Sequence, residues 1–193
     1  MDSSGITRSA SHAGSWYTNN KSELDTELTN YLKKAEKTIP EGHLKGIISP
    51  HAGLYYSGPT AAWSYINVDP SKYSRVFLLG PAHHTYLDGC ALSQCSEYDT
   101  PLGSIKIDVD TVKELHDTGE FKWFSLNDDE EEHSLEMHLP YIKKIFTGDD
   151  DQGTSSLYLQ LLQPIHIGIF EIVWKLGFIY ENLIFTHDIM KEL

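Results

Sequence analysis

The clearest pattern of apolar and polar positions lies near the start of the chain. Between residues 24 and 35, apolar side chains recur every three or four positions with charged residues between them. This spacing is typical of an amphipathic helix that buries one face. We expect Ser22 to cap the helix at its start and the proline- and glycine-containing segment 38–42 to end it.

Two short apolar runs come next, and each ends in a proline followed closely by a histidine. Residues 44–49 lead into a proline and His51, and residues 75–79 lead into a glycine, a proline and His83. Residues 60–65, with several small side chains, predict a short helix between the two runs. A strand, a helix and a strand within about 30 residues indicate a βαβ unit with two parallel strands.

The remaining pattern predicts smaller elements. We expect strands at residues 89–92, 104–107 and 121–126, and helices at residues 108–119 and 141–146. The acidic run 127–132 is interpreted as a solvated loop before the last helix, because it lacks the alternating ligands and the glycine of a calcium loop. Residues 157–185 are strongly apolar without a clean helical or strand period, and their polar interruptions make them a poor membrane span.

The two proline-histidine segments suggest a shared ligand site. Ligands of open parallel α/β sheets bind beyond the carboxyl ends of the strands, so His51 and His83 would converge there if their strands are neighbours. Imidazole suits zinc, copper, iron and nickel, although three protein ligands are usual at a catalytic metal. Glu136 and His138 are a third candidate source, for which a helix cap and a surface histidine remain the alternative.

Other aromatic residues leave alternatives open. Trp16 lies in a small, polar segment and is either a plug of the core or an aromatic wall of a pocket. We expect His12 to be a loop histidine with an ordinary hydrogen bond. His84, directly after His83, is expected to point elsewhere.

Composition narrows the class of protein. The 193 residues fit one domain, and a net charge of −13 argues against non-specific binding to nucleic acid or to anionic membranes. Cys90 and Cys95 do not make a disulfide framework and favour a reducing compartment. Because the first residues show no signal-peptide pattern, we expect a soluble protein that is cytoplasmic or also nuclear.

Five motifs, taken together and in order, resemble those of the Memo family. The resemblance covers about residues 8–146. The motifs are Ala-Ser-His-Ala-Gly-Ser-Trp-Tyr at 10–17, Pro-His-Ala-Gly at 50–53, Leu-Gly-Pro-Ala-His-His at 79–84, Thr-Pro-Leu-Gly at 100–103 and Glu-His-Ser-Leu-Glu-Met-His-Leu-Pro at 132–140.

The resemblance implies a fold and a function. Memo proteins are similar in fold to class III extradiol ring-cleaving dioxygenases, which implies an α/β/α sandwich around a mixed, partly parallel sheet. The family pocket uses histidines that match His51 and His83, and is associated with iron or copper and with redox chemistry. Family members also bind phosphotyrosine peptides in cell motility signalling, and the residues important there match Trp16 and Tyr56.

The chain departs from the family after about residue 147. The later family segments that supply an aspartate, a histidine and a cysteine metal ligand have no match, so residues 147–193 are expected to be a divergent tail on a sheet that is incomplete at its C-terminus. We therefore expect weak metal binding. Two alternatives stay open: a phosphopeptide-binding adapter without catalysis, and an inactive product of truncation or frameshift.

Overall fold

The computed structural model describes residues 5–39, 44–73, 75–147 and 157–163. Its helices are α1 (Lys21–Lys34), α2 (Leu54–Tyr65), α3 (Val109–Asp117), α4 (Leu126–Glu131) and α5 (Leu139–Thr147), with short 3-10 turns η1 (Pro70–Lys72) and η2 (Glu136–His138). Its strands are β1 (Thr7–Arg8), β2 (Arg75–Pro81), β3 (Cys90–Leu92), β4 (Glu97–Tyr98), β5 (Ile105–Lys106), β6 (Phe121–Trp123) and β7 (Leu157–Gln163).

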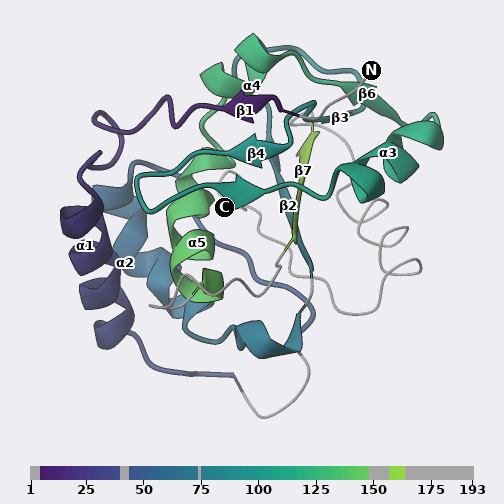
Figure 1. The fold of residues 1–193 in the computed structure, drawn as a ribbon. Helices are drawn as coiled ribbons and strands as arrows, with labels where there is room; N and C mark the ends of the chain where they lie inside the picture. The colour runs from purple at the N-terminus through teal and green to yellow at the C-terminus, as the bar shows by residue number, and fades with distance from the viewer. Residues whose placement is uncertain (1–4, 40–43, 74, 148–156, 164–193) are drawn as a thin grey trace, which may run out of the picture.

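The strands form a mixed, partly parallel arrangement. The larger sheet has the order β2-β7-β3-β6, in which β2 and β7 are parallel, β7 and β3 antiparallel, and β3 and β6 parallel. The smaller sheet has the order β1-β4-β5. Helices α1, α2 and α5 lie on one side of the β2–β7 pair and α3 on the other (Figure 1). The predicted α/β class with a mixed sheet is confirmed.

Local capping explains where the helices begin. Helix α1 is capped by the Asn20 side chain, which accepts hydrogen bonds from the backbone N–H groups of Ser22 and Glu23 at 3.0 and 3.1 Å. The prediction that Ser22 is the cap was therefore wrong by two residues. The Asp108 carboxylate accepts from the Thr111 N–H at 3.1 Å and caps α3 as expected.

The predicted βαβ unit is not formed. Residues 44–50 belong to none of the strands, and β2 pairs along all of its seven residues with β7 instead. Side chains bond two carbonyls of this segment: Tyr73 donates to the Leu44 carbonyl at 2.6 Å and Ser64 donates to the Ile48 carbonyl at 2.8 Å. Backbone groups that are bonded in this way need no strand partner.

The prediction that the acidic run 127–132 is a solvated loop was also wrong. Most of it forms α4, and within the run Asp129 and Glu132 are only 1% and 2% exposed, so it is not a solvated loop. The apolar stretch after residue 157 begins with strand β7, whereas residues 164–185 lie outside the described residues. Within the described ranges, no helix has the length and apolar character needed to cross a membrane.

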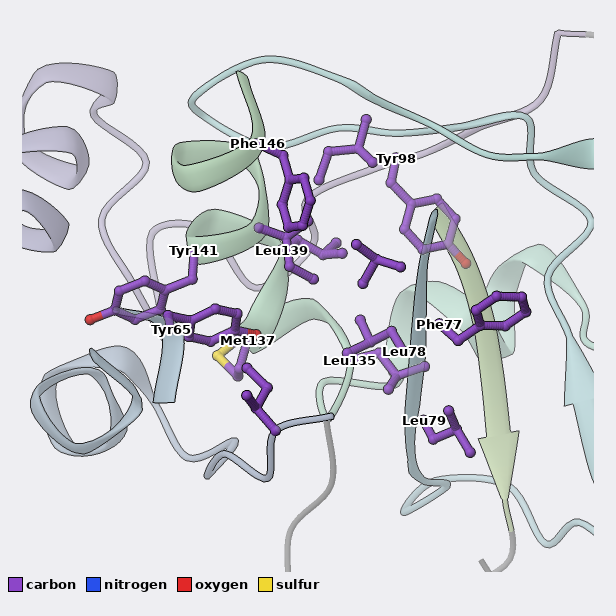
Figure 2. Close-up of a cluster of buried hydrophobic side chains, with 14 of the residues drawn as sticks. Tyr65, Phe77, Leu78, Leu79, Tyr98, Leu135, Met137, Leu139, Tyr141 and Phe146 are labelled. Atoms are coloured by element: carbon purple, nitrogen blue, oxygen red, sulfur yellow. The ribbon is translucent and has the colours of Figure 1, made fainter. Parts of the chain in front are cut away.

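The hydrophobic core joins α2, β2 and the segment from residue 135 to α5 (Figure 2). Tyr65 and Tyr141 stack with ring centroids 4.8 Å apart, and the Tyr141 hydroxyl donates to the Gly58 carbonyl at 2.7 Å. A Cβ at Gly80 would lie 2.6 Å from a methyl group of Leu135. This close approach, which only glycine permits, seats the segment that follows α4 against the carboxyl end of β2.

Candidate metal site

Three histidines meet next to the carboxyl end of β2. Ring nitrogens of His51, His83 and His133 all lie within 4.8 Å of one another. The ring centroids are 5.1 Å apart for His51 and His83, 5.6 Å for His51 and His133, and 4.5 Å for His83 and His133. Such a group can hold a metal ion, because imidazole is a ligand of most first-row transition metals.

Each histidine comes from a different loop. His51 precedes α2, His83 follows β2, and His133 follows α4. His51 is buried, His133 is half-buried and His83 is exposed, so the group opens to solvent on the side of His83. The two histidines singled out from the sequence thus lie side by side, although the segment before His51 is not a strand.

Glu132 holds two of these loops together. Its carboxylate accepts hydrogen bonds from the His83 Nδ1 at 3.0 Å, from the backbone N–H groups of His133 and Ser134 at 2.8 Å each, and from the backbone N–H of His83. Burial alone would raise the pKa of Glu132, but the hydrogen bonds from His83 and Ser134 outweigh it and lower this pKa to about 2. A carboxylate only accepts, so the His83 Nδ1 carries the proton and its Nε2 is left as a ligand atom.

His133 is the member of the group that sequence reasoning missed. Its ring lies between Trp16, with centroids 4.3 Å apart, and His83. Among the described residues its Nδ1 has no hydrogen-bond partner. Burial, with the neighbouring histidines, lowers the pKa of His133 to about 4, which keeps the ring neutral and able to bind a metal near pH 7. Its position within the fifth motif was the available signal, but the motif alone does not show where the ring points.

His138 is buried outside the three-histidine group. It is 2% exposed, and its Nδ1 lies 2.9 Å from the Tyr65 hydroxyl. Burial and the proximity of His51 lower the pKa of His138 to about 3. His138 is therefore not a surface histidine, and it is not a member of the three-histidine group. His84 is exposed, with its ring edge-on to His133 at 6.2 Å.

Glu136 belongs to a neighbouring buried network, in which the His12 ring centroid lies 6.0 Å from that of His133. Its carboxylate accepts from Arg8 at 2.7 Å, from the Tyr17 hydroxyl at 2.8 Å and from the His12 backbone N–H at 2.9 Å, and it also lies 2.8 Å from the His12 Nδ1. Burial would raise the pKa of Glu136, but the bond from His12 and the charge of Arg8 lower it to about 2. Its oxygens are thus occupied within the protein. His12 has a buried carboxylate as its partner, which is more than the ordinary loop hydrogen bond expected of it.

The two aromatic candidates lie near the start of α2. The Leu54 N–H donates to the Trp16 carbonyl at 2.9 Å, which holds the loop of Trp16 beside this helix. Trp16 is 37% exposed and its ring is tilted by 31° against that of His133, so it is not a plug of the core and lies beside the candidate site. Tyr56 is 77% exposed and packs edge-on against Tyr55, with centroids 5.2 Å apart.

Known proteins are similar to the part of the chain that carries these histidines. The family described as Memo-like protein matches residues 8–152. The chain is 47% identical over 147 residues to Protein MEMO1 of Danio rerio, which covers 76% of this chain and 49% of that protein. It is 48% identical over 139 residues to Protein memo-1 homolog of Caenorhabditis elegans, with 72% and 39% covered, and 46% identical over 149 residues to Protein MEMO1 of Homo sapiens, with 77% and 50% covered. The chain spans about half the length of these relatives or less.

Proposed function

Because this chain belongs to the Memo family, we propose that it binds a first-row transition metal, iron or copper, through His51, His83 and His133. The observation that supports the proposal is the approach of three ring nitrogens to within 4.8 Å of one another. We extend the proposal to the family roles in redox chemistry, metal handling and cell motility signalling. The burial of both Cys90 and Cys95 as thiols supports a reducing, cytoplasmic location.

The residues present fit such an ion. Three imidazoles make a ligand set with positions left for water or a small ligand, and a bound iron or copper ion would supply one-electron redox chemistry. Glu132 orients His83. The ring of His133 is held between Trp16, which is tilted against it, and His83, which stacks on it. All three proposed ligands are neutral, without a thiolate or carboxylate, so we expect weaker binding than at a site with an anionic ligand. Nitrogen ligands of this kind bind copper(II) more tightly than iron(II).

Metal titration of single variants tests this proposal. His51→Ala, His83→Ala and His133→Ala should each lower metal affinity by more than the roughly 10- to 100-fold loss that follows removal of an outer hydrogen-bond partner. His84→Ala is the matched control, because His84 is an exposed histidine beside His83 that is not part of the three-histidine group. Equal binding by the wild type and the three variants would overturn the proposal. A non-cooperative thermal melt of the wild type would favour an inactive partial domain instead.

A phosphopeptide-binding adapter is the second candidate, supported by the exposure of Trp16 and Tyr56 near one helix start. The arginines weigh against it. Arg8 is 1% exposed and bonded to two carboxylates, and Arg75 is bonded to Asp108 at 2.9 Å, whereas phosphate recognition favours accessible arginine clusters. A phosphotyrosine peptide whose binding is unchanged by Trp16→Ala and Tyr56→Ala would remove this candidate.

A further inference from the structure

The carboxylate of Glu132 is buried without a fixed cation. It is 2% exposed, and in the described part of the chain its carboxylate contacts the rings of His83 and His133 and no lysine or arginine. Arg8 donates to the backbone carbonyl of Glu132 instead, at 2.9 Å. A buried charge that lacks a cation is costly unless hydrogen bonds and a nearby positive charge compensate for it. In this case the hydrogen bonds are in place, and the rings on either side belong to the proposed metal site.

We propose that Glu132 is the positioning residue of this site: its carboxylate orients His83 with Nε2 as the ligand atom and fixes the spacing of the His83 and His133 loops. The inference rests on the proposed metal-binding function. Glu132 does not contact the ion. Its effect passes through the imidazole of His83 and through the backbone of both loops.

The hydrogen bonds to the two carboxylate oxygens carry this inference. Oε1 accepts from the His83 Nδ1 and from the backbone N–H groups of His133 and Ser134, while Oε2 accepts from the backbone N–H of His83. One carboxylate thus holds two ligand-bearing loops that are 49 positions apart in the sequence. The Ser134 hydroxyl adds a second tie, since it donates to the Pro81 carbonyl at 2.7 Å.

The charge of Glu132 is a separate contribution. A carboxylate that accepts from the outer nitrogen of a ligating histidine increases the basicity of the ring and therefore strengthens its bond to a metal. It would also place a negative charge next to the ring of a proposed ligand, His83. The three proposed ligands carry no negative charge. Among the groups bonded to them in the hydrogen bonds described above, Glu132 would supply the negative charge that offsets the charge of a bound ion.

Glutamine cannot reproduce this arrangement. All four groups that face the Glu132 oxygens are donors, and a glutamine amide offers one acceptor oxygen and one donor NH₂. In either orientation of the amide, the NH₂ faces at least one N–H group. Glu132→Gln therefore keeps the size of the side chain, removes the charge and breaks part of the network.

The first measurement is metal affinity. Titration of copper(II) alone should show a 10- to 100-fold weaker Kd for Glu132→Gln than for the wild type, about the loss expected for an outer partner of a metal ligand. Glu131→Gln is the matched control, because it makes the same change at the adjacent, exposed residue, and its Kd should equal that of the wild type. Equal affinity of Glu132→Gln and the wild type would overturn the inference and leave the proposed function standing.

The second measurement needs neither metal nor a variant. Nitrogen-15 NMR of the histidine rings in the metal-free wild type should show His83 protonated at Nδ1, with Nε2 unprotonated. A His83 ring protonated at Nε2 alone would overturn the inference even if the protein binds metal, because a carboxylate requires the Nδ1 proton. Conversely, a wild type that binds no metal but shows the Nδ1–H form would reject the proposed function and keep the orienting role of Glu132.

Discussion

Two glutamate–histidine pairs lie close together in this protein and differ in what surrounds them. Glu136 contacts His12 and shares its charge with Arg8, a cation that is 1% exposed. Glu132 contacts His83, and within the described residues its carboxylate is paired with histidines and with no lysine or arginine. The charge of Glu136 is balanced by a buried arginine. Glu132 instead bonds a histidine whose ring lies near two further histidines. The same residue types therefore build a structural network in one region and a candidate ligand site in the other.

The network of Arg8 is saturated. Its Nε bonds to Asp129 at 2.9 Å and its Nη1 bonds to Glu136 at 2.7 Å, while the Tyr98 hydroxyl donates to the second oxygen of Asp129 at 2.9 Å. Burial disfavours the charge of Arg8, but the two carboxylates overcome this and raise its pKa above the ordinary value. Strand β1, helix α4 and turn η2 are joined by these contacts, which hold the segment that carries His133.

The largest expected effect is on the closed network. Glu136→Gln leaves part of the charge of Arg8 buried without its partner, and breaking a buried ion pair in this way costs about 3–5 kcal/mol. For a chain of this size the melting temperature should fall by roughly 10 °C, as measured by circular dichroism. Glu131→Gln, at an exposed position, should melt like the wild type. Equal melting of the two variants would show that the network contributes little to stability.

The second prediction separates the two regions directly. His133→Ala should lower metal affinity by more than about 100-fold and change the melting temperature little, because the ring is half-buried and its Nδ1 is without a hydrogen bond in the described residues. His12→Ala should do the reverse, losing about 1–3 kcal/mol of stability with metal affinity kept. Parallel titrations and melts of both variants give the comparison. Loss of metal affinity in His12→Ala would contradict this division and show that the two regions act as one site.

The third prediction concerns acid. The folded pKa of Glu136 is lowered from 4.5 to about 2, so its stabilising contribution is fully present above about pH 4.5 and is lost as the pH falls toward 2. That contribution is on the order of 3 kcal/mol. Urea unfolding at pH 7, 4 and 3 should show a steeper loss for the wild type than for Glu136→Gln. Parallel curves for the two proteins would contradict this assignment.

The smallest expected effect is at the aromatic wall. Trp16→Leu removes the ring that packs against His133, and such an aromatic contact contributes about 0.5–1.5 kcal/mol, so metal affinity should fall by about 2- to 10-fold. Trp16→Phe should recover most of the loss. Trp63→Leu serves as the control because Trp63 is also partly exposed, at 44%, but lies on α2. Unchanged metal affinity in Trp16→Leu would contradict a role of Trp16 in metal binding, and the adapter hypothesis would then be the remaining role for this residue.

The sequence predicted the local elements better than their pairing. The apolar spacing before residue 35 and the Asp108 cap were sufficient to place α1 and α3, because helix periodicity and capping act over a few residues. Residues 44–49 have the composition of a strand and yet form none. Pairing depends on which segment reaches the edge of β2, and the partner, β7, lies about 80 positions further along the chain.

The amino-acid sequence by itself determined the α/β class and the family, and it pointed to His51 and His83 as neighbours, since these depend on motifs and local pattern. Only the tertiary structure decided that His133 joins them, and that Glu136 closes on Arg8 while Glu132 faces His83. The two glutamates are four residues apart and look alike in the sequence. Their roles differ because burial makes each carboxylate depend on the donors around it, and those donors come from positions 128 and 49 residues away.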